Sequence, residues 1–245
     1  MSVARLVELI DRRRPCVVLT GAGISTESGI PDFRSSSGIW AQYDPREVAT
    51  IDAFYANPAK VWEFYAHRLE MLGEAEPNDG HRALAELEER GWVEAVVTQN
   101  VDRLHARAGS RRVIEVHGTV GSARCLGCDT VVAGEELKAL LPVPACPECG
   151  SLLKPGVVLF GELLPEAAVA AAVDLAAGAG VLLVVGSSLA VFPVAGLPVE
   201  TLAAGGSVAI VNRGATQFDA HAEVTIDAGA GETLRALAAA LPDRP

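Results

Sequence analysis

Four cysteines form two Cys-x-x-Cys pairs near the middle of the 245-residue chain. Cys125 and Cys128 make up the first pair, and Cys146 and Cys149 follow at the spacing of a zinc ribbon. Each pair can place two thiolates on one metal ion, and four thiolates complete a tetrahedron that leaves no position for water. The sequence therefore predicts a structural rather than a catalytic zinc ion. Two disulfides or a redox-active pair are the alternatives, and the fifth cysteine, Cys16, is expected to be buried and inert.

A glycine-bearing loop follows the first apolar run of the chain. Gly21 and Gly23 allow a tight turn and let backbone N–H groups approach a phosphate, while Ser25 and Thr26 can open a helix whose N-terminus favours an anion. Thr26 stands where a dinucleotide fingerprint has its third glycine, so the loop alone does not exclude an ordinary strand-to-helix turn. The next segment, residues 29–34, adds a stiff turn, an aromatic ring and two opposite charges. Together they predict a loop that faces a charged cofactor.

Polar side chains follow two further apolar runs that are predicted to be buried strands. Asn100 and Asp102 come after residues 93–98, and His117 comes after residues 113–116. Because ligands bind at the carboxyl ends of parallel strands, all three can point into one crevice. A histidine at a strand end is more often structural, but an imidazole can accept a proton near neutral pH.

The loop motif GAGIS, followed by GIPDFR, resembles the sirtuin family of NAD-dependent protein deacylases. The resemblance extends over nearly the whole chain through four later motifs, at residues 99–102, 117–118, 125–149 and 186–188. It implies NAD as co-substrate, a structural Zn²⁺ ion and acylated lysine of proteins or peptides as substrate. It also implies that nicotinamide is held in a pocket beside Asn100 and Asp102.

In the reaction that this resemblance implies, the acyl-lysine carbonyl oxygen attacks C1′ of the ribose as nicotinamide leaves. His117 then acts as the general base, so that the 2′-oxygen attacks the alkylamidate carbon. The products are free lysine, nicotinamide and 2′-O-acyl-ADP-ribose. The implied cofactor-binding residues lie on the glycine loop, the strand ends and the chain's last strand-to-helix turn: Gly21, Ala22, Gly23, Ser25, Thr26, Asp32, Phe33, Arg34, Trp40, Gln99, Asn100, Val101, Asp102, Gly186, Ser187, Ser188, Asn212, Arg213, Gly214 and Ala230.

A predicted helix over residues 61–68 carries the strongest signal for the acyl group. Tyr65 and Arg68 stand at positions i and i+3, so a phenol and a guanidinium project from one face and can hold a carboxylate. A core tyrosine beside a snorkelling arginine is the alternative. Together with Ala49, the pair forms a trio that resembles class III sirtuins. The resemblance implies that the alanine leaves room for a longer acyl chain and that the substrate is succinyl-lysine, with malonyl, glutaryl and acetyl forms also accepted. Asp32 departs from that class, in which the position is often uncharged.

The resemblance also implies that an extended peptide adds as a strand beside residues 157–162. The implied substrate-binding residues are Ala49, Tyr65, Arg68, Val158, Phe160, Gly161 and Glu162. Two other functions stay open: NAD-dependent ADP-ribosyl transfer to a protein, and a non-catalytic module that binds acyl-lysine. Release of nicotinamide would exclude the second of these.

Strand and helix signals alternate along the chain and predict an α/β fold with a parallel, Rossmann-like sheet covered by helices on both faces. Strand signals resume at residues 157, 181 and 208 after the cysteine-bearing insert. The expected domains are a Rossmann-like NAD-binding domain, from residues 1–34, 81–118 and 156–245, and a small domain. Residues 35–80 and 119–155 build this small domain from a helical module and the zinc ribbon.

Composition narrows the class of partner. A net charge of −11 argues against nucleic acid and suits cationic partners, lysine-bearing proteins among them. Residues 1–15 lack the order of a secretory signal and are expected to form an amphipathic helix. Residues 175–199 carry no charge, but glycines, serines and prolines interrupt the run, so we expect no membrane span. A cytoplasmic, monomeric enzyme is the expectation.

Overall fold

A computed structural model describes residues 2–243 of the chain. Its backbone contacts divide the chain into two compact units. Unit 1 comprises residues 1–29, 76–116 and 165–245, and unit 2 comprises residues 30–75 and 117–164. Each unit is therefore assembled from separate stretches of the sequence.

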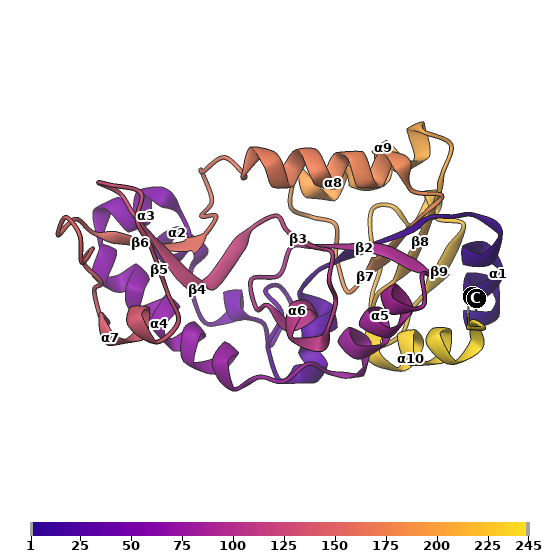
Figure 1. Ribbon diagram of the computed structural model, residues 1–245, viewed down its shortest axis with the longest axis horizontal. Helices are drawn as coiled ribbons and strands as arrows, with labels where there is room; N and C mark the ends of the chain where they lie inside the picture. The colour runs from indigo at the N-terminus through magenta and orange to yellow at the C-terminus, as the bar shows by residue number, and fades with distance from the viewer. Residues whose placement is uncertain (1, 244–245) are drawn as a thin grey trace. The chain divides into compact units, whose positions relative to one another are not determined.

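Unit 1 is built on a six-stranded parallel sheet with the strand order β3-β2-β1-β7-β8-β9 (Figure 1). Its strands are β1 (Cys16–Thr20), β2 (Val93–Thr98), β3 (Val113–Glu115), β7 (Val181–Val185), β8 (Ser207–Val211) and β9 (Val224–Ile226). The chain runs outward in one direction from β1 to β3 and in the other from β7 to β9. The strand order thus reverses between β1 and β7, where open α/β sheets bind their ligands.

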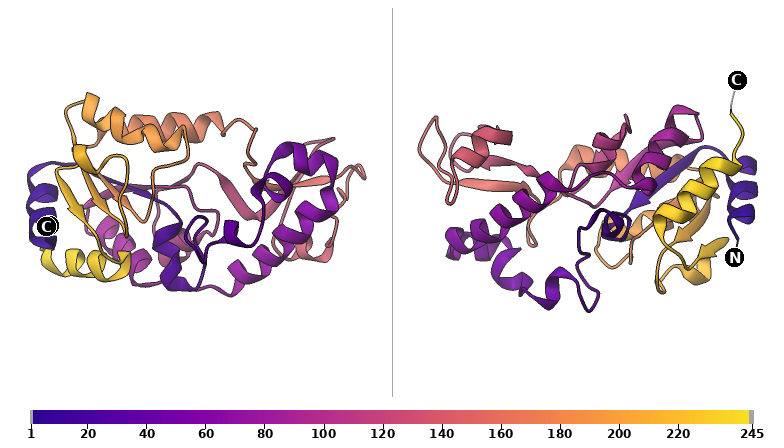
Figure 2. Two further views of the ribbon diagram at one scale, coloured as in Figure 1. Left: turned by 180° about the vertical axis from the view of Figure 1, so that it is seen from behind. Right: turned by 90° about the horizontal axis from the view of Figure 1, so that it is seen from below.

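Helices cover both faces of this sheet, as the views in Figures 1 and 2 show. They are α1 (Val3–Arg12), α5 (Asp79–Glu89), α6 (Leu104–Ala108), α8 (Glu166–Gly178), α9 (Leu197–Ala203) and α10 (Ala230–Ala240), with the 3₁₀ helices η1 (Ala22–Ser28), η3 (Val194–Gly196) and η4 (Asp219–His221). The main core lies between the sheet and helices α1, α5 and α10. Helix α9 packs on α8 and on strands β7 and β8. The predicted fold class is confirmed.

The central strands form where the sequence predicts them because their side chains are buried on both faces. Strands β1, β7 and β8 are buried along their whole length, as expected of apolar, β-branched runs in a parallel sheet. The predicted helix over residues 1–15 is present as α1, with Leu6, Leu9 and Ile10 in the core. One strand prediction was wrong: the strand expected to begin at Val157 ends there as β6, and it belongs to a different sheet.

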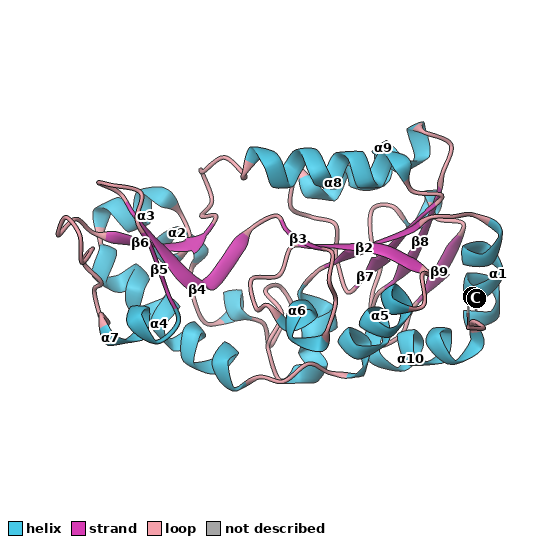
Figure 3. Cartoon of the chain, in the orientation of Figure 1, coloured by secondary structure: helices cyan, strands magenta, loops and turns pink. Residues whose placement is uncertain are grey.

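Unit 2 combines a group of helices with a small antiparallel sheet of order β5-β4-β6 (Figure 3). The strands are β4 (Gly118–Cys125), β5 (Val131–Ala133) and β6 (Leu153–Val157). The helices are η2 (Ile39–Ala41), α2 (Pro45–Val48), α3 (Ile51–Ala56), α4 (Pro58–Glu74) and α7 (Gly134–Ala139). Trp62 of α4 is buried and donates from Nε1 to the carbonyl of Leu153, 2.8 Å away, which fastens the longest helix to β6.

Helix α3 ends and helix α4 begins at Asn57-Pro58. The side chain of Asn57 caps α4 by accepting from the N–H of Lys60, and Pro58 occupies the first turn, where a missing N–H costs nothing. Over residues 2–243, none of the helices combines the length and the apolar character that a membrane crossing requires.

Candidate functional site

The glycine loop, residues 21–28, packs against the end of β7 at the point where the strand order reverses. The N–H of Gly23 donates to the carbonyl of Gly186 over 2.8 Å, and a Cβ on either Gly21 or Gly23 would lie 2.8 Å from that oxygen. Gly186 has φ +59, and a Cβ on it would lie 2.3 Å from the nitrogen of Ile24. All three positions therefore require glycine, because the two loops touch through their backbones.

The loop forms the 3₁₀ helix η1, which begins at Ala22. The prediction of a helix opened by Ser25 or Thr26 was wrong, because both residues lie inside this tighter turn. The hydroxyl of Thr26 donates to the carbonyl of Gly23 (2.9 Å). Ser25 is buried, with its hydroxyl directed to the end of strand β2.

Ser25, Asn100 and Asp102 form one buried hydrogen-bonded cluster. Ser25 Oγ donates to Asp102 Oδ2 over 2.7 Å, and Asn100 Nδ2 donates to both Ser25 Oγ and the carbonyl of Gly21, at 3.1 Å each. Asp102 Oδ1 accepts from the N–H of Leu104 and so also fixes the start of α6. The structure thus joins the glycine loop to the two polar residues predicted at the end of β2.

Two buried histidines adjoin this cluster, and neither belongs to a motif that would identify it as a site residue from the sequence. His81 Nδ1 accepts from the N–H of Asn78 as part of a capping box, and its Nε2 lies 3.5 Å from Ser25 Oγ. His105 Nε2 lies 2.9 Å from the hydroxyl of Thr20, and the two imidazole centroids are 4.9 Å apart. Burial lowers the pKa of His81 to about 4 and that of His105 to about 3, so both rings are neutral at physiological pH. An Asn three residues before a His was the only local signal, and it predicts a helix cap.

The remaining predicted cofactor residues of unit 1 follow the strands β2, β7, β8 and β9. Gln99 Nε2 donates to Ser187 Oγ (2.9 Å), which links the ends of β2 and β7. Asn212 directs its Nδ2 to the carbonyls of Arg213 and Gly214 and so shapes the turn after β8. The other members are Val101 between the two polar residues, the exposed Ser188 after β7, and Ala230 at the first position of α10.

In unit 2, the predicted cofactor residues at 32–40 belong to an aromatic group. The Phe33 and Trp40 rings are 5.2 Å apart, and the rings of Trp40 and Phe64 are 6.3 Å apart. Asp32 Oδ1 accepts from the backbone N–H groups of Arg34 and Ser35. Its carboxylate therefore holds the turn, and the Arg34 side chain is exposed.

Arg68 is buried in the same aromatic group, with only 5% of its surface exposed. Its guanidinium carbon lies 5.3 Å from the centroid of the Phe33 ring and 5.8 Å from that of Phe64, within the range of cation–π contacts. The Tyr65 ring packs edge-on against Phe64 at 5.0 Å. Burial raises the pKa of the Tyr65 phenol, which the Arg68 charge partly offsets, so the phenol keeps its proton. The predicted Tyr/Arg pair is thus buried on one helix.

Residues 157–162 bring the predicted substrate-binding residues into one backbone arrangement. The N–H of Val158 donates to the carbonyl of His117 (2.9 Å), and the N–H of Phe160 donates to the carbonyl of Ala49 (2.8 Å). Ala49 is buried, whereas Phe160 is 47% exposed. Glu162 turns inward instead: its Oε2 accepts from Lys154 Nζ and from the N–H of Leu159, at 2.9 and 2.8 Å.

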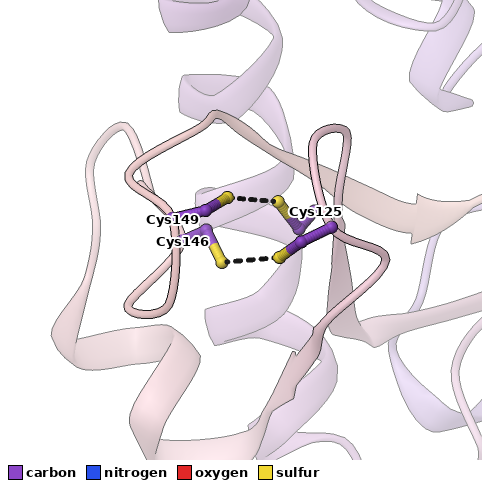
Figure 4. A group of neighbouring side chains, drawn as sticks. Cys125, Cys146 and Cys149 are labelled. Carbon is purple, nitrogen blue, oxygen red and sulfur yellow. Dashed lines mark hydrogen bonds between the residues drawn. The ribbon is translucent and has the colours of Figure 1, made fainter.

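The four cysteines meet at one point of unit 2, as Figure 4 shows for the labelled Cys125, Cys146 and Cys149. Their sulfur atoms all lie within 4.8 Å of one another, and Cys125 Sγ is 3.4 Å from Cys149 Sγ. That separation is far longer than a disulfide bond of about 2.05 Å and close to the edge of a ZnS₄ tetrahedron, about 3.8 Å.

The surroundings of the cysteines also fit a metal ion. Hydrogen bonds from Ser151, first among several, lower the pKa of the Cys149 thiol to about 6, and the N–H of Gly127 points to Cys125 Sγ at 3.2 Å. A Cβ on Gly127 would lie 2.4 Å from Ser151 Oγ, so a larger residue there would displace the Ser151 side chain. These residues form a closed structural metal site, as the spacing predicts. Cys16 is not a member of this group and is buried in β1.

Comparisons with known proteins agree on one family. The model of the Sir2 family matches residues 21–193. The chain is 48% identical over 234 residues to NAD-dependent protein deacylase 2 of Pyrobaculum aerophilum, covering 96% of this chain and 92% of the relative. It is 45% identical to an NAD-dependent protein deacetylase of Thermotoga maritima, over 89% of this chain and 90% of that one. A solved structure of Sir2 with a p53 peptide and NAD⁺ superposes with a TM-score of 0.89 at 42% identity, covering 97% of each chain.

Proposed function

Because the chain belongs to the Sir2 family and is an NAD-dependent protein deacylase, we propose that it acts preferentially on lysines that carry acidic acyl groups. Succinyl-lysine is the proposed best substrate, with malonyl and glutaryl forms accepted and acetyl-lysine turned over more slowly. The observation that carries the proposal is the buried Arg68 beside Tyr65.

The geometry of Arg68 suits a carboxylate better than a neutral acyl chain. The guanidinium carbon lies near the rings of both Phe33 and Phe64, so its charge is held in apolar, aromatic surroundings. Arginine binds a carboxylate through two parallel hydrogen bonds, and a protonated phenol can add a third. A charge held in such an apolar place interacts strongly with an opposite charge, because little water competes.

The adjoining segment supports a peptide substrate. The N–H of Phe160 donates a hydrogen bond to the carbonyl of Ala49. Ala49, whose small side chain is proposed to leave room for the acyl group, therefore lies beside residues 157–162. We propose that Val158, Phe160 and Gly161 pair with an extended peptide through the backbone, which selects little by sequence. Glu162 would then act indirectly, since its carboxylate holds the turn and is already paired with Lys154.

In unit 1 we propose that the glycine loop and the ends of β2, β7 and β8 bind NAD. The co-substrate supplies a ribose that is activated by its bond to nicotinamide. Asn100 and Asp102 would orient the nicotinamide end, because Ser25 already fixes both side chains. His117, the residue before β4, would accept the proton of a ribose hydroxyl as general base. The domain ranges of the sequence prediction, with an NAD-binding domain and a small domain, remain part of this proposal.

The test compares two peptides that differ only in the acyl group. Arg68→Met removes the charge but keeps an apolar side chain of similar length, so packing against Phe33 and Phe64 is largely preserved. We expect kcat/KM for the succinyl peptide to fall about 30- to 1000-fold, equivalent to ~2–4 kcal/mol for a buried charge pair, and kcat/KM for the acetyl peptide to change less than about threefold. The assay measures free lysine peptide and nicotinamide together.

A matched control removes a cation from the same helix at a distance from the aromatic group. Lys60 is half exposed and pairs with Glu47 on the surface, so Lys60→Met should alter neither substrate preference nor rate. Equal losses on both peptides with Arg68→Met would refute the acyl preference. A target that gains an ADP-ribosyl mass, instead of losing the acyl mass, would indicate transfer to protein rather than deacylation.

A further inference from the structure

Glu27 connects the glycine loop to a helix more than two hundred positions later in the chain. Its Oε1 accepts from the N–H of Gly231 over 3.1 Å, and the two residues are 204 positions apart in the sequence. Gly231 is the second residue of α10, whose first N–H groups have no partner within the helix. The carboxylate is therefore both a hydrogen-bond acceptor and a favourable charge at the helix N-terminus.

The backbone around this contact is shaped to receive the carboxylate. A Cβ on Gly231 would lie 2.2 Å from Glu27 Oε2, and the next nearest atoms also belong to Glu27. A Cβ on Gly229 would lie 3.1 Å from Glu27 Oε1. Two glycines thus flank Ala230, and both lie against the same side chain.

A second hydrogen bond holds the same turn. The N–H of Gly214, in the turn after β8, donates to Asp227 Oδ1 over 3.1 Å. Asp227 and Gly231 bracket the turn between β9 and α10. This turn is therefore tied to the residues after β8 through Asp227, and to the glycine loop through Glu27.

We infer that Glu27 is a positioning residue for NAD binding, because its carboxylate fixes the position of residues 229–231 relative to the glycine loop. The inference rests on the proposed function, which assigns the glycine loop and the end of β8, with Gly214, to the cofactor, and on Ala230, which the sequence analysis predicts to be a further cofactor contact. Ala230 would contact NAD through its backbone. The strength of that contact therefore depends on the position of the turn and not on the side chain of Ala230. Glu27 itself is exposed and needs to touch no part of the reacting groups.

Kinetics separate positioning from mere stabilisation. Glu27→Ala should raise KM for NAD and the Kd for ADP-ribose by the same factor, about three- to tenfold for the loss of one helix-capping carboxylate. The kcat and the KM for the acyl peptide should stay unchanged. Glu27→Gln keeps an oxygen for the Gly231 N–H and should lie within about twofold of the original enzyme. The matched control is Glu232→Ala, which removes an exposed acid from the first turn of the same helix.

Gly231→Ala supplies the decisive comparison. In the wild-type background the methyl group of the new alanine would displace the Glu27 carboxylate, so KM for NAD should rise as it does in Glu27→Ala. In the Glu27→Ala background the space is open, and the same substitution should add no further rise. A rise of equal size in both backgrounds would overturn the inference, as would a loss of kcat with KM for NAD unchanged.

Hydrogen exchange with and without ADP-ribose distinguishes two negative outcomes. Either Glu27 has no positioning role, or residues 229–231 do not bind the cofactor. Protection of the amides of residues 229–231 is expected in the original chain. If ADP-ribose protects residues 21–26 but not 229–231, the assignment of Ala230 is wrong and the inference falls with it. If residues 229–231 are protected but Glu27→Ala binds ADP-ribose normally, only the role of Glu27 is refuted.

Discussion

The hydroxyl of Ser25 donates a hydrogen bond of 2.7 Å to Oδ2 of Asp102, although 77 positions separate the two residues in sequence. Ser25 Oγ also accepts a hydrogen bond from Asn100 Nδ2, so this one hydroxyl donates to Asp102 and accepts from Asn100. It joins the turn after β1 to the turn after β2 at the carboxyl edge of the sheet. The orientation of both polar side chains at the end of β2 thus depends on a residue of the glycine loop.

Ser25→Ala should disable the enzyme without unfolding it. The substitution leaves a buried carboxylate oxygen without its donor, which costs about 1.5–3 kcal/mol for a bond to a charged group. If the free energy of the transition state rises by this amount, kcat/KM falls about 10- to 100-fold. Ser110→Ala is the matched control, because Ser110 Oγ is buried and has no hydrogen-bond partner among residues 2–243. Equal activity of the two variants would show that the hydrogen bond between Ser25 and Asp102 does not contribute to catalysis.

The buried histidines predict a loss of stability in acid. Burial lowers the pKa of His81 to about 4 and that of His105 to about 3 in the folded chain, against about 6.5 when unfolded. The unfolded chain therefore binds these protons first as the pH falls. Stability is complete above about pH 6.5 and declines by about 1.4 kcal/mol per pH unit for each histidine, down to the folded pKa.

His105→Gln tests this slope. Glutamine can still bond to the Thr20 hydroxyl but does not titrate, so the variant should lose about 2 kcal/mol less stability than the original chain between pH 7 and pH 5. Urea unfolding at both pH values, with zinc in excess, measures the difference. Parallel declines in the two proteins would show that His105 does not supply the pH dependence.

The metal site predicts a two-step release of thiols. A chelator should expose four reactive thiols per chain, because the four clustered sulfur atoms then lose their ion. Cys16 should react only after full unfolding, since burial raises its pKa to about 12 and thiolates are the reactive form. Counting thiols with a coloured reagent, before and after the chelator and then in denaturant, checks both steps. A fifth thiol that reacts together with the first four would contradict the assignment.

Elements that carry their own local signal could be predicted from the sequence. Strand β2 occupies the predicted range 93–98, and β7 begins at the predicted residue 181, because apolar runs bounded by polar turns have few alternatives in a parallel sheet. The cysteine spacing likewise fixes the ligands of the metal site. Each of these signals lies within one short stretch of sequence, which for the cysteines is residues 125–149.

Features that depend on distant contacts could not be predicted. His105 meets Thr20 across 85 positions, and nothing near either residue indicates that the contact exists. The Glu162 carboxylate was expected at the substrate, yet Lys154 and a backbone N–H bind it, because the chain turns back on itself there. The 3₁₀ form of η1 has the same origin, since the contact with Gly186 decides the path of the glycine loop.

That contact between the two loops gives the last prediction. Gly186→Ala places a Cβ 2.3 Å from the Ile24 nitrogen, at a residue whose φ of +59 already disfavours side chains, so the glycine loop must shift. NAD binding should weaken more than tenfold, and the unfolding free energy should fall by about 1–3 kcal/mol. Gly178→Ala is the control at the end of α8: nothing lies within 4 Å of its Cβ, and the better helix former should be neutral or slightly stabilising. Calorimetric titration with ADP-ribose and thermal unfolding of both variants measure the two effects, and normal binding by Gly186→Ala would show that the cofactor does not depend on this backbone contact.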